Sequence, residues 1–247
     1  ARVTIIGNGI KEAFFKNMDP IGKNIKMDKE TFITENAYGK DKSSLHYWKS
    51  HRNKLDDLYP SERYFLYPTL KSVKSVLDVG CAAGGSFDFC REVKSNIDYT
   101  GIDISKKLIN IANKLHPKGI FFVYNGHEIA FKENKFDLVF SIGVLHHLHH
   151  WREMIIQMVK CSSNSTIFDI RLTNEETLDN AKKYYQYITF DGRRKSKTAI
   201  SYLVLNIDDF KNFMDLELTT KNIELERESK ALKKDLLKMA NALPKGA

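Results

Sequence analysis

The residues best suited to bind a small ligand lie in one short stretch, VLDVGCAAGGSF, from Val76 to Phe87. The apolar run Ser75 to Val79 predicts a buried strand, and the glycines after it predict a turn that leads into a helix. Gly80 can adopt backbone angles that a side chain forbids, while Gly84 and Gly85 let a ligand approach the main chain. The free N–H groups at the start of such a helix favour an anionic group.

Two acidic residues indicate which ligand this turn suits. A dinucleotide site requires G-x-G-x-x-G, and Ala82 stands where the second glycine would admit a pyrophosphate. Asp78 at the strand end would repel a diphosphate, but it suits an ammonium group. Asp103 ends the next predicted strand, 23 residues after Gly80, where a carboxylate can accept both hydroxyls of a ribose. These features favour S-adenosylmethionine, which carries an ammonium group, a carboxylate and a ribose diol.

The segment VLDVGCAAGG resembles motif I of the class I, Rossmann-like S-adenosylmethionine-dependent methyltransferases. FDLVFSIGVLHHLHH, from Phe136 to His150, is similar to the segment that follows the fourth strand in that family. With Asp103 between them, the resemblance covers about residues 74–172. It implies an α/β fold with a doubly wound, seven-stranded, mostly parallel sheet, and a cytoplasmic transferase that uses S-adenosyl-L-methionine.

The resemblance also implies which residues contact this cofactor. Besides the two acids, they belong to the glycine-rich turn, the residue beside the adenine, the loop N-G-H after the third strand, and the main chain after the fourth. Asn125 stands where the family often has an acid that reaches the adenine amino group. The implied cofactor-binding residues are Asp78, Gly80, Cys81, Ala82, Gly84, Asp103, Ile104, Asn125, Gly126, His127, Ser141 and Ile142.

A histidine cluster follows the fourth predicted strand. In the family its first two members, here His146 and His147, lie at the mouth of the pocket, where one can act as a general base because imidazole titrates near neutral pH. A packed wall histidine is the alternative. His146 and His150 would share a helix face, but no cysteine or carboxylate stands at ligand spacing beside them, so no metal is predicted.

Aromatic and basic residues outside the motifs are candidates for binding the methyl acceptor. Tyr47 and Trp48 lie in a helical segment before the first strand, where they can stack on the acceptor or cover the sulfonium. Arg171 ends the predicted fifth strand, and Arg193 and Arg194 lie in a basic loop; guanidinium groups bind oxyanions in a bidentate way. The alternatives are an aromatic pair that packs on the domain and a solvated loop.

The chain divides by pattern into three parts. Residues 1–40 form an extension, 41–223 the methyltransferase domain, and 224–247 a charged helix. The first part predicts a strand, an amphipathic helix, a turn and a hairpin, and its F-x-x-x-D-P-I-G-K resembles a stretch in the periplasmic core domain of macrolide-export-type ABC permeases. Because the first residue is Ala1, a fragment, a fusion and an artificial chain all remain open.

Four further elements are predicted after the fifth strand. They are a helix over 174–187, a sixth strand over 199–206, a helix over 207–214, and an antiparallel seventh strand over 216–223.

Composition limits the function classes. The 247 residues suffice for one large domain, and no run of 18 apolar residues predicts a membrane span. Three cysteines without ligand spacing favour free thiols in a reducing cytoplasm. A net charge of +8 fits an anionic substrate or nucleic acid, and equally an ordinary lysine-rich composition.

The predicted reaction is in-line methyl transfer to an oxygen or nitrogen of a small-molecule or saccharide acceptor. SYLVLNIDDF, residues 201–210, resembles a segment of some saccharide methyltransferases. The absence of an N-P-P-Y motif after the fourth strand argues against methylation of base amino groups. Two alternatives remain: an RNA or tRNA methyltransferase that uses the basic loop, and a non-catalytic or artificial chain that retains the cofactor-binding fold. The sequence predicts no oligomeric state.

Overall fold

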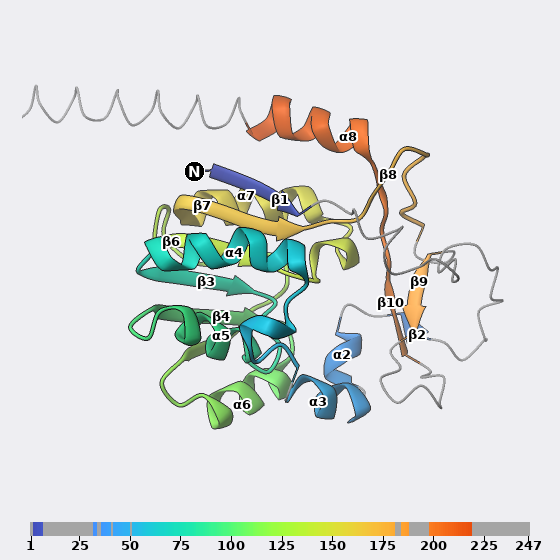
Figure 1. Ribbon diagram of the computed structural model, residues 1–247. Helices are drawn as coiled ribbons and strands as arrows, with labels where there is room; N and C mark the ends of the chain where they lie inside the picture. Colours follow the sequence, from blue (N-terminus) through green and yellow to red (C-terminus); the bar gives the residue numbers. More distant parts are fainter. Residues whose placement is uncertain are drawn as a thin grey trace, which may run out of the picture. The chain divides into compact units, whose positions relative to one another are not determined.

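The computed structural model of the chain divides into two compact units, residues 1–205 and 206–247 (Figure 1). The residues it describes are 2–6, 32–33, 36–40, 42–49, 51–180, 184–187 and 198–218.

A parallel sheet forms the centre of the first unit (Figure 1). Its strands, in spatial order, are β1 (Arg2–Ile6), β7 (Ser162–Asp169), β6 (Phe136–Ser141), β3 (Ser75–Val79), β4 (Asp98–Asp103) and β5 (Ile120–Val123). Every neighbouring pair runs parallel. β3, β4 and β6 are almost wholly buried, as expected for strands that elements cover on both faces.

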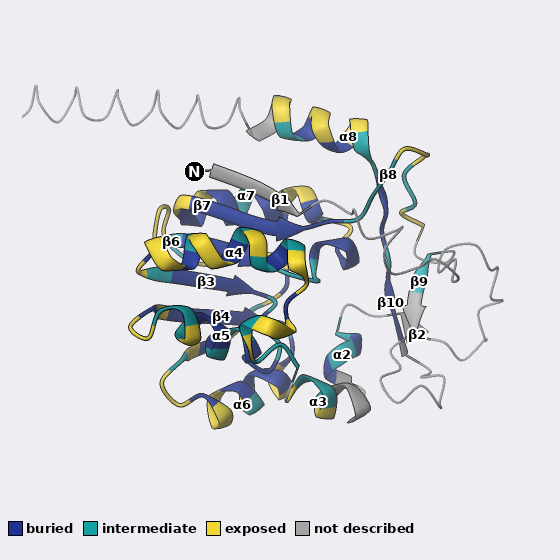
Figure 2. Cartoon of the chain, in the orientation of Figure 1, coloured by how far each residue is buried: buried dark blue, intermediate teal, exposed yellow. Residues whose placement is uncertain are grey.

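Three helices share one hydrophobic core on the sheet: α4 (Pro60–Ser72), α5 (Gly85–Val93) and α6 (Lys106–Leu115). α7 (Trp151–Cys161) contacts β6 and β7. From β3 the chain adds β4 and β5 on one side of that strand, and it then adds β6 and β7 on the other side. Because crossovers between parallel strands are right-handed, α7 lies on the face of the sheet opposite to α5 and α6. Figure 2 shows the buried strands and the exposed outer side of α4.

Local sequence explains why several predicted bounds agree with the structure. β3, α6 and α7 have the limits that the sequence patterns predict for them, 75–79, 106–115 and 151–161. α6 begins where expected because the Ser105 side chain accepts a hydrogen bond from the backbone N–H of Leu108, at 3.3 Å. The strands predicted over 96–103 and 119–124 begin two residues and one residue later, as β4 and β5.

The predicted seven-stranded sheet differs from the structure, in which the described sheet has six strands, all parallel. The predicted sixth strand, 199–206, is two short strands that both lie outside this sheet, while β1, from the predicted extension, pairs with β7. The small strands are β2 (Phe32–Ile33), β10 (Thr198–Ser201) and β9 (Tyr185–Tyr187) in one sheet, and β8 (Leu172–Thr173) with β11 (Leu205–Asn206) in another.

The helix predicted over 174–187 is wrong. Residues 174–180 contain no helix, and β9 occupies 185–187. The backbone groups of Leu178 and Val204 exchange two hydrogen bonds, with N···O distances of 2.8 and 3.1 Å. This pairing with a segment 26 residues further along the chain holds the backbone extended, and no local pattern reports it.

Two short helices precede the sheet strands. They are α2 (Ala37–Lys40) and α3 (Lys42–Trp48), followed by the 3-10 turn η1 (Leu55–Asp57). α2 contacts β10 and α6. Because α2 contacts elements that are far apart in the sequence, it can form one wall of a site at the carboxyl ends of the strands.

The second unit begins with α8 (Ile207–Asn212), which Asn206 caps by accepting hydrogen bonds from the N–H groups of Asp208 and Asp209. The helical turn η3 (Phe213–Leu218) follows, so the antiparallel strand predicted over 216–223 is wrong for 216–218, and 219–223 lie outside the described residues. The predicted charged helix also lies outside them. Among the helices that the structure describes, none is long and apolar enough to span a bilayer.

Candidate functional site

A pocket lies at the carboxyl ends of β3, β4 and β6. The strand order reverses between β3 and β6, and such switch points are where open parallel sheets bind ligands. Loops after these strands form one wall, and α2, α3 and residues 51–52 form another. The space between them, including its open mouth, is about 970 Å³, which suits a small-molecule ligand.

The glycine-rich turn is held by backbone geometry. Gly80 and Gly84 have φ values of 86° and 85°, the left-handed region that glycine tolerates best. The N–H groups of Gly80 and Cys81 both donate to the Ile102 carbonyl, at 2.8 and 3.0 Å. A Cβ on Gly80 would stand 2.3 Å from Cγ2 of Val144. The turn is therefore fixed against β4 and the loop after β6.

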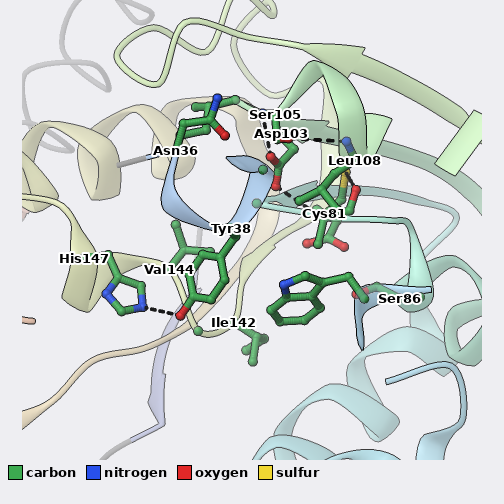
Figure 3. A pocket seen from close by; sticks show the side chains of 18 of the residues that line it. Asn36, Tyr38, Cys81, Ser86, Asp103, Ser105, Leu108, Ile142, Val144 and His147 are labelled. Carbon is green, nitrogen blue, oxygen red and sulfur yellow. Dashed lines mark hydrogen bonds between the residues drawn. The ribbon is translucent and has the colours of Figure 1, made fainter. Parts of the chain in front are cut away.

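Asp103 lies at the end of β4 with its carboxylate directed to this turn (Figure 3). Its Oδ2 accepts from the Ala82 N–H at 3.0 Å, and its Oδ1 accepts from the Ser105 N–H at 2.8 Å. Burial raises the pKa of Asp103 to about 6, although these backbone hydrogen bonds oppose the shift. At neutral pH the group is an oriented carboxylate with remaining acceptor capacity.

Asp78, at the end of β3, has a partner that the sequence did not reveal. Its Oδ2 accepts from the buried hydroxyl of Tyr99 at 2.6 Å. Burial raises the pKa of Asp78 to about 6, against the hydrogen bonds from Tyr99 and Ser86. Tyr99 lies on β4, opposite Val76 of β3, and Val76 stands two residues before Asp78. Only this register of the two strands brings the side chains of Tyr99 and Asp78 together.

The remaining predicted cofactor residues fall into two groups. Those that line the pocket, in addition to the two acids, are Gly80, Cys81, Ala82, Ile104, Gly126 and Ile142. Those that do not line it are Gly84, Asn125, His127 and Ser141. The Asn125 side-chain oxygen accepts from the N–H groups of His127 and Glu128, both at 2.8 Å, and Ser141 Oγ donates to the Val79 carbonyl at 2.8 Å. These side chains shape the loops, and their contacts with a ligand stay a prediction.

His147 lines the pocket, whereas His146 does not. His147 Nδ1 lies 2.7 Å from the Ser201 carbonyl, which can only accept, so Nδ1 carries the proton. Its Nε2 therefore accepts from the Tyr38 hydroxyl, at 3.3 Å (Figure 3). Burial lowers the pKa of His147 to about 4 and that of His146 well below its usual value, so both are neutral near pH 7. The predicted catalytic roles stay predictions.

The predicted acceptor-binding residues are placed differently from one another. Trp48 lines the pocket; Tyr47 does not, and its hydroxyl lies 2.8 Å from His51 Nε2. Arg171 is paired with Asp169 at 2.9 Å and donates to the Tyr202 hydroxyl at 3.3 Å, away from the lining. Arg193 and Arg194 lie outside the described residues.

Several lining residues were not predicted as site residues, and five of them come from the segment before β3. These five are Asn36, Tyr38, Gly39, His51 and Arg52. Arg52 forms an ion pair with the buried Glu62 at 2.8 Å. A Cβ on Gly85 would stand 2.4 Å from the His51 carbonyl oxygen, so this segment lies directly on the start of α5. The aromatic pair Tyr47 and Trp48, which the sequence already made candidates for ligand binding, was the available signal for this segment.

No group of three or more histidine, cysteine, aspartate or glutamate side chains in the described part of the chain is arranged to hold a metal ion. Cys81, Cys90 and Cys161 are free and buried. Burial raises the pKa of the Cys81 thiol, so this lining residue is protonated and is not a thiolate nucleophile.

Comparisons with known proteins identify a family. A family model described as a methyltransferase domain matches residues 47–208. The phthiotriol/phenolphthiotriol dimycocerosates methyltransferase of Mycobacterium tuberculosis is 29% identical over 107 residues, which cover 41% of this chain and 40% of that protein. Ajmaline N-methyltransferase of Rauvolfia serpentina is 34% identical over 106 residues, covering 39% of this chain and 35% of that protein. The matches thus span less than half the length of these relatives.

Two solved structures also align with part of the chain. The plantazolicin methyltransferase BpumL in complex with SAH aligns with a TM-score of 0.44 at 21% identity, over 56% of this chain and 57% of that one. The PH0226 protein of Pyrococcus horikoshii aligns with a TM-score of 0.45 at 17% identity, over 69% and 88%. The family match begins at residue 47, so the resemblance of the N-terminal stretch to ABC permeases stays a prediction, as do the predicted domain limits.

Proposed function

The chain belongs to the methyltransferase domain family, and on that basis we propose that it transfers a methyl group from S-adenosylmethionine to a small-molecule acceptor. S-adenosylmethionine is the methyl donor of this family. The observation that carries the proposal is the Asp103 carboxylate, which two backbone N–H groups hold beside the glycine-rich turn.

The residues present fit the three polar parts of this donor. The Asp103 carboxylate can accept from a ribose diol, as acids at the end of the second strand do in nucleotide-binding sheets. Asp78, ionised above about pH 6, suits the ammonium group. The N–H groups at the start of α5 and the guanidinium of Arg52, which lines the pocket, suit the carboxylate.

The donor supplies an activated methyl group on a sulfonium, so the protein needs no covalent nucleophile. The chain's own residues instead hold the acceptor atom in line with the methyl group, about 3 Å away. Residues of α2 and α3 line the pocket beside the strand ends, where they can limit the access of water. A general base is needed only for an acceptor group whose pKa lies well above neutral. Neutral His147 can accept a proton or a hydrogen bond through Nε2.

Two measurements test the proposal. Calorimetry should show binding of S-adenosylmethionine and of its demethylated product. An assay with a tritiated methyl group, run on an extract divided into RNA, glycan and small-molecule fractions, should label the small-molecule fraction. Label in the RNA fraction would support the predicted alternative of an RNA or tRNA methyltransferase, and label in the glycan fraction a saccharide acceptor. The absence of both binding and transfer would support a non-catalytic chain.

A further inference from the structure

One end of the pocket is built from residues that the donor does not need. Tyr38 in α2, His147 and Leu148 after β6, and Ile200 in β10 all line it. They form one patch, because Tyr38 packs against buried Ala37 and Ile200, and its hydroxyl reaches His147. Figure 3 shows the Tyr38–His147 contact apart from Asp103 and Ser105. α2 reaches from this end of the pocket to the region of Asp103 and Ser105. Its Gly39 lies so close to Ser105 that a Cβ on Gly39 would overlap the Ser105 side chain.

This patch, Tyr38, His147, Leu148 and Ile200, contains no charged group at neutral pH. The charged residues of the described lining are Arg52, Asp78 and Asp103. Asp78 and Asp103 lie at the ends of β3 and β4, and the Arg52 backbone lies against Gly85 at the start of α5. Arg171, which acts electrostatically on both histidines, is paired with Asp169 and does not line the pocket. The patch therefore offers aliphatic and aromatic surface and one chain of hydrogen bonds, which joins Tyr38, His147 and Ser201.

The hydrogen bonds of this chain all point in one direction. The Ser201 carbonyl accepts from His147 Nδ1, and His147 Nε2 accepts from the Tyr38 hydroxyl. The Tyr38 proton is thus donated towards His147, and a hydroxyl oxygen can accept up to two hydrogen bonds. The pair presents an acceptor to a ligand that brings its own O–H group.

We propose that the methyl acceptor is an uncharged, largely apolar molecule with a phenol-type hydroxyl, and that this hydroxyl hydrogen-bonds to the Tyr38–His147 pair. The inference rests on the proposed function and names the substrate class and two residues for it. An apolar body buries favourably against Leu148, Ile200 and the Tyr38 ring. Among the described residues of this patch, a saccharide would leave several hydroxyls without partners, and a phosphate would lack a cation.

The proton path balances with this arrangement. The acceptor oxygen forms a bond to the methyl carbon while the carbon–sulfur bond breaks, and its electron pair stays on sulfur. The acceptor proton passes to the Tyr38 oxygen, and the Tyr38 proton passes to His147 Nε2. The positive charge lost from sulfur appears on the imidazole, which afterwards releases the proton to solvent.

The electrostatics of the pair favour an acidic hydroxyl. Burial lowers the pKa of His147 to about 4, with a smaller lowering from Arg171 that Asp169 and the Ser201 hydrogen bond oppose. The rings of His146 and Tyr202 also lie against it, at centroid distances of 4.1 and 5.9 Å. A weak base that is neutral near pH 7 before the transfer assists a phenol, which loses its proton readily as the new bond forms, better than a sugar hydroxyl.

Probe acceptors test the substrate class. The tritiated-methyl assay is run with 4-phenylphenol, with its anionic analogue 4-(4-hydroxyphenyl)benzoate, with phenyl glucoside and with a short RNA. We expect label on 4-phenylphenol at least about tenfold above the benzoate, and none on the glucoside or RNA. Preferred transfer to any of the other three overturns the inference, as does no transfer to 4-phenylphenol by protein that binds the demethylated donor. Failure of that binding itself would instead refute the proposed function.

A matched pair of variants tests the two residues. Tyr38→Phe removes only the hydroxyl and should lower kcat about 100-fold, with affinity for the demethylated donor within about twofold of the parent. Tyr64→Phe makes the same change at an exposed position on α4 and should change neither.

If Tyr38→Phe lowers the melting temperature strongly, His147→Asn serves in its place. The asparagine amide can keep the hydrogen bond to Ser201 while it removes Nε2, so it should lower kcat in the same way. An unchanged kcat in a folded variant, or a loss confined to donor affinity, overturns the role of the pair.

Discussion

The two ends of the pocket are built in different ways. At the end where we propose that the donor binds, called the donor end below, Asp103 and the glycine-rich turn are held by backbone N–H groups and by strand register, within one 26-residue stretch from Asp78 to Asp103. At the acceptor end, Tyr38, His147 and Ile200 come from three segments more than 50 residues apart, and side-chain contacts join them. Backbone-held geometry tolerates little change, whereas a side-chain assembly can vary in shape while the sheet stays intact.

The difference predicts that the largest loss of donor binding comes from Asp103→Ala. Charged hydrogen bonds contribute about 1.5–3 kcal/mol, so the dissociation constant of the demethylated donor should rise about 10–100-fold. Asp98→Ala, at the exposed start of the same strand, should leave it unchanged. Calorimetry on both variants measures the contrast, and equal affinities would refute the donor site proposed here.

A second prediction concerns the backbone of the turn. Gly80→Ala places a side chain at φ 86° and 2.3 Å from Val144 Cγ2, whereas Gly143→Ala has φ 77° and open space. In both variants the left-handed backbone lowers the free energy of unfolding by about 1–2 kcal/mol. Only Gly80→Ala adds the overlap of its new methyl group with Val144. Thermal unfolding should therefore show a larger loss for Gly80→Ala. Adding Val144→Ala should recover the excess, and no recovery would show that the overlap is not the cause.

Donor binding should also depend on pH. The pKa values of Asp78 and Asp103 are raised to about 6 by burial, and only the ionised forms suit an ammonium group and a diol. Protonation therefore competes with binding as the pH falls below about 6, and affinity at about pH 5 should be lower by up to about tenfold for each carboxyl. Titration calorimetry across this range measures it. Asp103→Asn should flatten the profile, and a parent affinity independent of pH would contradict the assignment.

The smallest of these four effects is expected for Ile200→Val, at the end where we propose that the acceptor binds. Ile200→Val removes one buried methyl group and should lower the free energy of unfolding by about 0.5–1.5 kcal/mol. Because Ile200 belongs to the acceptor patch, the KM for 4-phenylphenol should rise while affinity for the demethylated donor stays within about twofold. Ile97→Val, buried in the core outside the pocket, should cost similar stability without a change in KM. A loss of donor affinity in Ile200→Val would show that the two ends are not separable.

Sequence patterns predicted the elements whose bounds depend on local signals. β3 and α6 begin and end as expected, because an apolar run defines the first and the Ser105 cap defines the second. The helix predicted over 174–187 failed because Leu178 pairs with Val204, a long-range contact that no local propensity reports. The same limit hid Tyr99, which meets Asp78 only through the register of β3 and β4.

The sequence by itself determined the donor end of this protein: Asp78, the glycine-rich turn and Asp103 lie close together in the chain, and strand geometry places them at one edge of the sheet. The tertiary structure alone decided the acceptor end. There α2 brings Tyr38 against His147 and Ile200, because burial of apolar surface and one hydrogen-bonded pair join segments that the chain keeps far apart.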